Sequence, residues 1–351
     1  MLKHIEWNGR NLRFLDQTRL PLEEYFIETA DYRVVAEAIR KLQLRGAPLI
    51  GVSAAYGVCL GAIEALGDSR ERFFASLEKV DEELRSTRPT AVNLFWALDR
   101  MKRIWQTLQA RDEAPQKVVE ELLEEAHHIA REDEETNEKI ARYGAQLFQD
   151  GDRILTHCNA GALACSAWGT ALGAITWAFV KEGKRVVVYA DETRPLLQGA
   201  RLTAFELWKN DIPVRVICDN MAGFLMARRE IDKVIVGADR VARNGDFANK
   251  IGTYTVALLA HYHRIPFYVA APLSSFDPQS PDGSHIPIEE RNPEEVLVFN
   301  GRRIAPCEVG AKNPAFDVTP GHLVTAFITE RGIIRPPYKE HFESLFAQEG
   351  G

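Results

Sequence analysis

From residue 153 onward the chain alternates short apolar, often β-branched runs with segments of helical periodicity. The runs lie at residues 154–156, 186–189, 214–217, 234–236 and 267–270. Strands that are apolar on both sides are typical of a parallel sheet with helices on both faces, because parallel neighbours need a long crossover connection. The pattern predicts a doubly wound, mostly parallel, Rossmann-like α/β domain, which we place at residues 149–351.

Polar or ionisable residues follow four of these runs. The first run ends at His157 and Cys158, and the next three lead to Asp191, Asp219 and Asp239. The carboxyl ends of parallel strands share one edge of the sheet, where ligands of such folds bind. One aspartate at a strand end commonly caps the next helix. Several beside a cysteine favour a shared cleft instead.

Cys158 stands where an apolar strand gives way to a run of small residues with helical character from Ala162 onward. The sequence therefore predicts a strand that runs directly into a helix. The positive end of a helix favours anions and stabilises a thiolate, so this position would make a cysteine reactive. The alternative is an ordinary small buried cysteine.

The first half of the chain reads as a mainly helical domain, residues 1–148. Alternating Ile5 and Trp7 precede Asn8-Gly9, which predicts a β-hairpin. We predict a helix at residues 30–42 capped by Thr29, and further helices at 47–66, 70–85, 90–110 and 115–149. The segment 47–66 is long enough to cross a membrane, but its regularly spaced glycines favour a tightly packed core helix. We expect no membrane span.

Composition excludes several classes of function. The net charge of -7 gives no basic footprint for nucleic acid. The 5 cysteines are scattered without CxxC pairs, which argues against a zinc site or a disulfide framework and favours a reducing, cytoplasmic location. No signal peptide is evident at the start. His127 and His128 are adjacent and make a poor metal pair. We expect no metal.

Cofactor motifs are also absent from the sequence. Neither GxGxxG after the strand at 154–156 nor a Walker pattern occurs, so we expect no cofactor and chemistry by side chains alone. Cationic residues at expected helix starts suggest capture of a small phosphorylated ligand. They are Arg45 with the Gly46 and Ala47 amides, Arg88 before Pro89 and Thr90, and Asn249-Lys250, which we expect to open a helix at 251–263. Each cation singly is more often a solvated charge.

Linked motifs along nearly the whole chain closely resemble the methylthioribose-1-phosphate isomerase family. They are Arg45-Gly46-Ala47-Pro48-Leu49-Ile50-Gly51, Arg88-Pro89-Thr90-Ala91-Val92-Asn93-Leu94, Thr156-His157-Cys158-Asn159-Ala160-Gly161, Glu192-Thr193-Arg194-Pro195, Gln198-Gly199-Ala200-Arg201-Leu202-Thr203, Gly237-Ala238-Asp239-Arg240, and Asn244-Gly245-Asp246 through Asn249-Lys250-Ile251-Gly252-Thr253-Tyr254. The family shares its fold with regulatory subunits of translation initiation factor 2B and with ribose-1,5-bisphosphate isomerases.

The resemblance implies an activity and a site. Members of the family convert 5-methylthioribose 1-phosphate to 5-methylthioribulose 1-phosphate in methionine salvage, and the resemblance implies a homodimer. The family's catalytic cysteine and aspartate fall on Cys158 and Asp239. Its substrate-contacting positions fall on Arg45, Gly46, Ala47, Arg88, Gln198, Asn249 and Lys250.

Other functions remain open at this stage. One is isomerisation of a different sugar phosphate, such as ribose 1,5-bisphosphate or 5-deoxyribose 1-phosphate. Another is a non-catalytic regulatory subunit, for which the pair of Cys158 and Asp239 would have no chemical purpose. For catalysis, Asp239 would protonate the ring oxygen if burial keeps its carboxyl neutral. Cys158 would either remove the C2 proton or flank a direct hydride shift.

Overall fold

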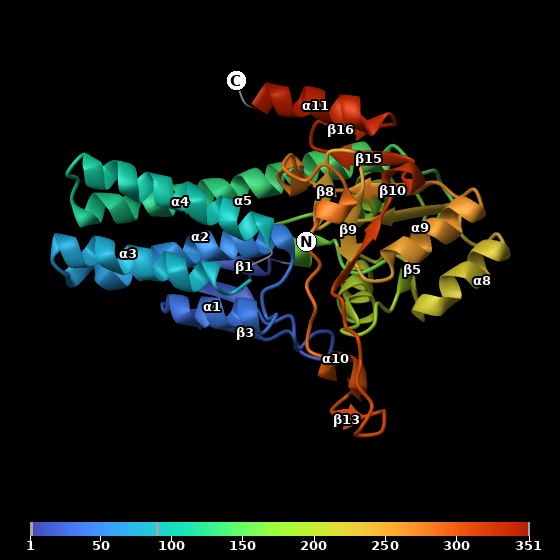
Figure 1. Ribbon diagram of the computed structural model, residues 1–351, viewed down its shortest axis with the longest axis horizontal. Coiled ribbons are helices and arrows are strands. Elements are labelled where there is room, and N and C mark those ends of the chain that lie inside the picture. Colours follow the sequence, from blue (N-terminus) through green and yellow to red (C-terminus); the bar gives the residue numbers. More distant parts are fainter. Residues whose placement is uncertain (1–2, 89–90, 350–351) are drawn as a thin grey trace. The chain divides into compact units, whose positions relative to one another are not determined.

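The computed structural model describes residues 3–88 and 91–349, and it divides the chain into two compact units. Unit 1 comprises residues 1–137 and 162–169, and unit 2 comprises residues 138–161 and 170–351. Figure 1 shows unit 1 as mainly helical and unit 2 as a sheet with surrounding helices. The expected boundary between residues 148 and 149 stays a prediction about independently folding domains.

Unit 1 opens with a three-stranded antiparallel sheet. Its strands are β1 (Ile5–Asn8), β2 (Asn11–Leu15) and β3 (Phe26–Thr29), in the order β1-β2-β3. Asn8 pairs with Asn11, so the predicted hairpin is confirmed. Leu12 and Phe14 of β2 are fully buried, which anchors this sheet on the helical core.

Five helices follow, as the periodicity predicted. They are α1 (Tyr32–Arg40), α2 (Ala47–Glu64), α3 (Arg70–Arg85), α4 (Val92–Ala110) and α5 (Pro115–Ala145), and α5 continues into unit 2. The predicted cap of the first helix is wrong. The Asp31 side chain, not Thr29, accepts from the Arg33 amide, because the chain is still in β3 at Thr29. The predicted start at residue 90 lies outside the described residues.

Helix α2 is the core element of unit 1. Gly51 lies against the backbone of Asn93 in α4, and Gly61 lies against Val80 in α3. Among the described residues, one helical segment, Ala47–Gly67, is long and apolar enough to cross a membrane, and 83% of its most apolar window is buried within the protein. This burial is what the glycine spacing predicted for a core helix.

Unit 2 is organised around a seven-stranded sheet in the order β16-β15-β10-β7-β4-β5-β6. The strands are β4 (Arg153–Thr156), β5 (Val187–Asp191), β6 (Val214–Ile217), β7 (Lys233–Val236), β10 (Phe267–Ala270), β15 (Ala326–Thr329) and β16 (Gly332–Ile334). All neighbours are parallel except β15 and β16. The five predicted strands are therefore confirmed as one parallel set.

Successive side chains of the central strands enter two different cores. Ile154 of β4 and Ile235 of β7 pack with α6 (Ala171–Thr176), α7 (Ala204–Lys209) and the end of α5. Leu155 and Val234 pack with α8 (Ala222–Ala227) and α9 (Thr253–Tyr262). Because neighbouring residues of a strand point to opposite faces, helices cover both sides of the sheet.

A second, smaller sheet was not predicted. It consists of β11 (Phe276–Asp277), β8 (Arg240–Ala242), β9 (Phe247–Lys250) and β14 (Phe316–Thr319), in that order. The expectation that Asn249 and Lys250 open a helix is wrong, because both residues belong to β9 and α9 begins at Thr253. Pairing of β9 with the distant β14 decides the conformation here.

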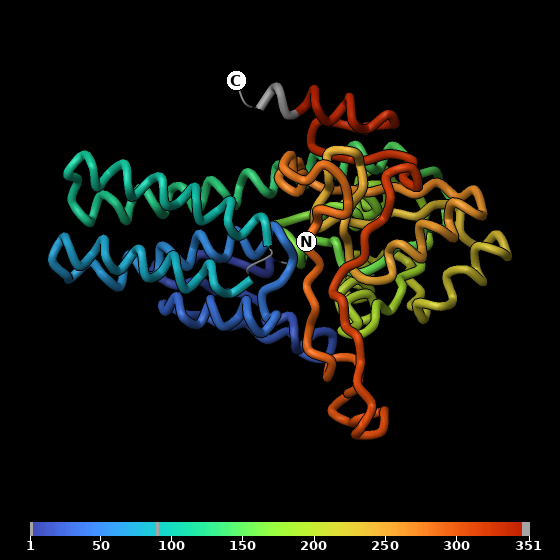
Figure 2. The backbone as a smooth tube through the Cα atoms, viewed as in Figure 1, coloured from blue at the N-terminus to red at the C-terminus, as the bar shows by residue number. Residues whose placement is uncertain are grey.

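The remaining elements are short, except for the last helix, α11. They are α10 (Glu294–Leu297), β12 (Val298–Phe299), β13 (Arg302–Arg303), α11 (Tyr338–Glu349), and the 3-10 or π turns η1 (Ala65–Gly67), η2 (Ala162–Ala164), η3 (Trp177–Lys181), η4 (Gly199–Thr203), η5 (Asp219–Met221), η6 (Leu273–Ser275), η7 (Gly283–His285) and η8 (Gly321–Leu323). The segment that carries α10 and β13 projects from unit 2, as the backbone tube in Figure 2 shows.

Candidate active site

The order of the strands reverses between β4 and β7. From β4 the chain adds β5 and then β6 on one side, and it returns to β7 on the other side of β4. In open parallel sheets, such a reversal opens a crevice beyond the carboxyl ends of the two strands, where ligands bind. Cys158 follows β4 and Asp239 follows β7, so both sequence-predicted catalytic residues stand at this edge.

The loops that carry these two residues are in contact. A Cβ added to Gly237, directly after β7, would come within 2.8 Å of the Ala160 Cβ in the loop after β4. Asp239 is half-buried, and its amide donates to the carbonyl of Ala248 in β9 at 2.9 Å. Arg240 Nη1 donates to Asp277 Oδ2 at 3.1 Å and forms an ion pair with this carboxylate.

The predicted helix directly after Cys158 is wrong. Cys158 is a half-buried residue in a left-handed conformation (φ 64°), and the chain makes only the short turn η2 before α6 begins at Ala171. The Asn159 side chain donates to the buried Glu206 carboxylate at 2.8 Å and holds the loop away from a helical path. The proposed stabilisation of a Cys158 thiolate by a helix start therefore has no basis in this fold.

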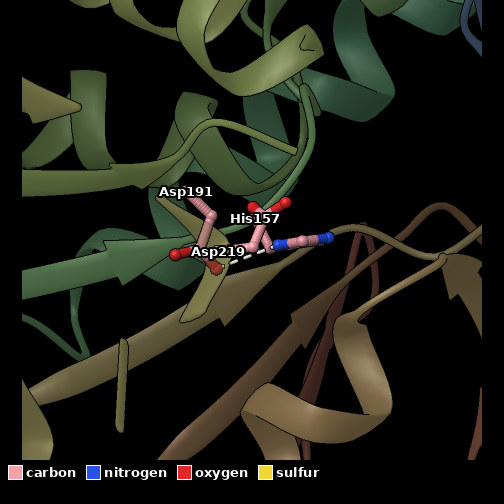
Figure 3. Close-up of side chains that lie close together, drawn as sticks. All are labelled: His157, Asp191 and Asp219. Atoms are coloured by element: carbon pink, nitrogen blue, oxygen red, sulfur yellow. Dashed lines mark hydrogen bonds and ion pairs between the residues drawn. The ribbon is translucent and has the colours of Figure 1, made fainter. Parts of the chain in front are cut away.

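The residues that end β4, β5 and β6 do converge, as the sequence predicted. Figure 3 shows the side chains of His157, Asp191 and Asp219 close together. One possible ligand atom of each lies within 4.8 Å of the others. His157 Nδ1 lies 2.9 Å from Asp191 Oδ2, and Nε2 lies 2.8 Å from the carbonyl oxygen of Ile251. His157 therefore connects β4 to β5 and to the turn before α9.

The His157 and Asp191 side chains hold a proton between them. A carbonyl oxygen only accepts, so Nε2 carries a hydrogen, and a second hydrogen lies between Nδ1 and Asp191 Oδ2. Burial disfavours the charged imidazolium, but the hydrogen bond and charge of Asp191 outweigh it and raise the pKa of His157. The site thus keeps a buried proton next to Cys158.

The same three residues are the one group among the described residues whose donors suit a metal ion. Hydrogen bonds already engage most of these donors. Both nitrogens of His157 have partners, and the two Asp219 oxygens accept from the amides of Thr193 and Arg194, each at 2.8 Å. Asp191 Oδ2 is bonded to His157, whereas Asp191 Oδ1 is buried without a partner among the described residues. Most of the cluster is therefore a network that fixes loops.

The substrate-contacting positions expected in unit 2 differ in their surroundings. Gln198 is buried, and its Oε1 has no hydrogen-bond partner within the part of the chain that the structure describes. Asn249 Nδ2 donates to the hydroxyl of Thr253 at 3.0 Å. Lys250 Nζ donates to the Ala315 carbonyl at 2.9 Å. An unpaired buried acceptor is costly, so Gln198 is suited to receive a donor from a ligand.

Arg45, Gly46, Ala47 and Arg88 lie in unit 1. Helix α2 begins at Ala47 as predicted, with Gly46 at its N-cap in a conformation (φ 101°) that favours glycine. A Cβ on Gly46 would collide with Ala164, which follows Cys158 by six residues in the chain. Arg88 is half-buried after α3, and Pro89 and Thr90 lie outside the described residues.

Sequence reasoning missed the residues that shape the Cys158 loop. Thr193 Oγ1 accepts from the Cys158 amide at 2.9 Å, and Thr203 Oγ1 donates to the Cys158 carbonyl at 2.6 Å. Both threonines belong to motifs that carry the family resemblance. Nothing in their sequence spacing identifies a backbone partner 35 or 45 residues earlier in the chain.

Comparisons with known proteins identify the family of this chain. The model of the Initiation factor 2 subunit family matches residues 43–336. Methylthioribose-1-phosphate isomerase from Syntrophotalea carbinolica is 55% identical over 345 residues, covering 98% of this chain and 99% of the relative. The enzyme of that name from Fervidobacterium nodosum is also 55% identical, over 347 residues, with 98% and 97% covered.

Solved structures give the same fold. The crystal structure of 5-methylthioribose 1-phosphate isomerase from Pyrococcus horikoshii has a TM-score of 0.92 and 44% identity, covering 99% of this chain and 96% of its own. A structure from A. fulgidus described as translation initiation factor eIF-2B, subunit delta, has a TM-score of 0.86 and 46% identity, covering 97% and 98%. The chain belongs to the initiation factor 2 subunit family, which includes methylthioribose-1-phosphate isomerases that share more than half of its residues.

Proposed function

We propose that the protein is an aldose–ketose isomerase that converts 5-methylthioribose 1-phosphate to 5-methylthioribulose 1-phosphate. The observation that carries the proposal is that Cys158 and Asp239 follow neighbouring parallel strands at the point where the strand order reverses, in loops that touch. Relatives named for this activity match this chain over nearly its full length and theirs. A pure binding subunit would have no chemical reason to hold this pair.

Each expected site residue receives a role in the proposal. Arg45 and Arg88, with the amides of Gly46 and Ala47, bind the phosphate, because guanidinium groups and helix-start amides both favour an anion. The buried Gln198 Oε1 accepts from a sugar hydroxyl. Asn249 and Lys250, at the end of β9, contact the sugar phosphate. They lie beside the Asp239 loop, because the Asp239 amide is bonded to Ala248 of the same strand.

Ring opening is the first chemical step. A sugar phosphorylated at its anomeric carbon cannot open freely to an aldehyde, so the bond between C1 and the ring oxygen must break while the phosphate stays attached. Asp239 gives its proton to the ring oxygen and becomes a carboxylate. Proton transfer by a positioned group typically contributes about 100-fold to 10,000-fold to a rate.

Hydrogen then moves from C2 to C1, and the C2 hydroxyl gives its proton to the Asp239 carboxylate and becomes the ketone, which restores the acid. In one route Cys158 as thiolate removes the C2 proton to leave an enol, and the Cys158 thiol, after exchange with solvent, gives a proton to C1. In the other, C2 transfers a hydride to C1, with Cys158 beside it. Solvent deuterium at C1 of the product would support the first route, and its complete absence would count against that route.

The proposal extends to the setting of the enzyme. We infer that unit 2 is a doubly wound, Rossmann-like domain, that the protein works in the cytoplasm in methionine salvage, and that it forms a homodimer. Exposed aromatic side chains on two helices in contact support self-association: Phe224 of α8 is 63% exposed and Tyr262 of α9 is 80% exposed. Light scattering of the purified protein tests the dimer, with Tyr262→Asp as the disrupting variant.

The activity is tested with three substrates. Purified protein is incubated separately with 5-methylthioribose 1-phosphate, ribose 1,5-bisphosphate and 5-deoxyribose 1-phosphate, without added metal or nucleotide, and ketose formation is followed. We expect the largest kcat/KM for the methylthio sugar. A larger value for the bisphosphate would assign the protein to the other isomerase, and no turnover of any of the three would refute the proposed reaction.

A further inference from the structure

The backbone at Cys158 needs support from its surroundings. Its φ of 64° lies in the left-handed region, which is unfavourable for a residue with a Cβ atom. Such conformations persist where neighbouring groups fix them, and they are concentrated at functional sites. At Cys158, the neighbouring groups are the hydroxyls of two threonines.

The two hydroxyls bind opposite sides of the cysteine. Thr193 Oγ1 accepts from the Cys158 amide at 2.9 Å and donates to the Asp191 carbonyl at 3.0 Å. Thr203 Oγ1 donates to the Cys158 carbonyl at 2.6 Å. Both threonines are fully buried, at 0% exposure, so water cannot replace their hydroxyls. The peptide groups before and after Cys158 are therefore each held by one threonine.

Each threonine is itself anchored. Thr193 is also left-handed (φ 63°), and its amide donates to Asp219 Oδ1 while the Arg194 amide donates to Oδ2, both at 2.8 Å. Thr203 lies in η4, which continues directly into α7, and its Oγ1 also lies 3.3 Å from Asn159 Nδ2. The two hydroxyls thus attach Cys158 to two anchored segments. One is the turn at Thr193 that Asp219 holds, and the other is the segment that continues into α7.

We propose that Thr193 and Thr203 are positioning residues, which fix the peptide groups on both sides of Cys158 and so set the direction of its thiol. The proposal rests on the role given to Cys158 above. A displacement of about 1 Å at a reacting group can cost on the order of 100-fold in rate. Removing either hydroxyl should therefore lower kcat and leave substrate binding largely intact.

Valine and serine variants separate the hydroxyl from the methyl group. Valine keeps the shape of threonine and removes the hydroxyl, whereas serine keeps the hydroxyl. We expect Thr193→Val and Thr203→Val each to lower kcat about tenfold or more, with KM changed less than about threefold. Thr193→Ser and Thr203→Ser should restore most of the lost kcat. Valine variants that keep kcat within about twofold of wild type would overturn the proposal.

Thr319→Val is the matched control. Thr319 is also 0% exposed and in unit 2, but its hydroxyl has no hydrogen-bond partner among the described residues. The Thr319→Val variant loses a hydroxyl group from an equally buried site and should keep the wild-type kcat. An equal loss of kcat in Thr319→Val would mean that any buried hydroxyl has this effect, and the positioning role would be refuted.

A chemical probe tests, without relying on catalysis, whether the hydroxyls of Thr193 and Thr203 hold Cys158 in place. In a Cys218→Ser, Cys307→Ser background, which removes the two exposed cysteines, iodoacetamide labelling of Cys158 is followed by mass spectrometry. Loss of either threonine hydroxyl should let the half-buried Cys158 thiol reach solvent more often. The labelling rate of Cys158 should therefore rise about threefold or more in the valine variants. An unchanged or lower labelling rate would refute the proposal that the two hydroxyls hold Cys158. If Cys158→Ala kept full turnover, the proposed catalytic role of Cys158 would be wrong. The labelling rates would still show whether the two hydroxyls hold Cys158.

Asp219→Asn keeps the proposal testable if a valine variant fails to fold. Asp219 is only half-buried, and asparagine has one acceptor oxygen where two amides need one each. This variant should loosen Thr193 and give the same pattern, a lower kcat and faster labelling of Cys158. If a folded Asp219→Asn protein kept the wild-type kcat and the wild-type labelling rate of Cys158, the positioning role of Thr193 would be refuted.

Discussion

Gly237, directly after β7, lies against Ala160, two residues after Cys158, with no room for a side chain between them. The contact joins the two loops that carry Cys158 and Asp239. Its close approach depends on a glycine at this position, so the distance between the loops is sensitive to a single methyl group.

Gly237→Ala should therefore separate the loops. The added Cβ would stand 2.8 Å from that of Ala160, which is closer than carbon atoms approach, and the short Ala160 side chain cannot swing away. We expect a destabilisation of about 1–3 kcal/mol and a loss of kcat of about tenfold or more. Urea unfolding and initial rates provide the two readouts. Gly310→Ala, where nothing lies within 4 Å, is the control and should behave as wild type.

Cys158→Ser and Asp239→Asn should each lower turnover by about 100-fold or more, because each removes a group that transfers or guides a proton in the reaction. Both changes are nearly isosteric, so the unfolding temperature should stay close to that of wild type. Initial rates of ketose formation and a thermal melt check the two statements. Near-normal turnover in either variant would remove that residue from the mechanism.

Gln198→Met tests the unpaired acceptor. The Gln198 Oε1 is buried without a partner among the described residues, so an apolar side chain of similar length should leave the free protein as stable as before or more stable. With substrate, the lost hydrogen bond should lower kcat/KM by about 5-fold to 30-fold. Lower stability together with unchanged kcat/KM would mean that Oε1 serves the fold and not the ligand.

The proton held by His157 and Asp191 predicts a pH dependence of stability. The pKa of His157 is raised in the folded state, so its contribution is complete below the unfolded value of about 6.5 and is lost as pH rises through the folded value. The free energy of unfolding of wild type, relative to His157→Gln, should fall as pH rises above about 6.5. Urea unfolding at several pH values measures it. A difference that grows with pH would contradict the assignment.

The strands at the site were predictable because their signal is local. The apolar, largely β-branched runs at β4, β5, β6, β7 and β10 favour strands, and parallel pairing brings their ends to one edge. Strand β9 was not predictable, because Asn249 pairs with Asp317, 68 positions later in the chain. That non-local pairing overrides the helical pattern read from residue 251.

The Cys158 loop shows the same limit more sharply. Small residues after Cys158 have helical character, but the bond from Asn159 to Glu206 and the two threonine hydroxyls hold the chain in another path. Those bonds join side chains to a backbone conformation that no residue pattern encodes. The sequence therefore identified candidate reactive residues, whereas the groups proposed to orient Cys158 could be found only from the fold.

The most direct test of the account is a crystal structure of the Cys158→Ser variant with 5-methylthioribose 1-phosphate bound. The account predicts an Asp239 carboxyl oxygen within about 3.2 Å of the ring oxygen, and the hydroxyl that replaces the Cys158 thiol within about 4 Å of C1 or C2. A sugar ring bound elsewhere, or with either side chain farther than about 6 Å from these atoms, would contradict the claim that the two loops act on one substrate.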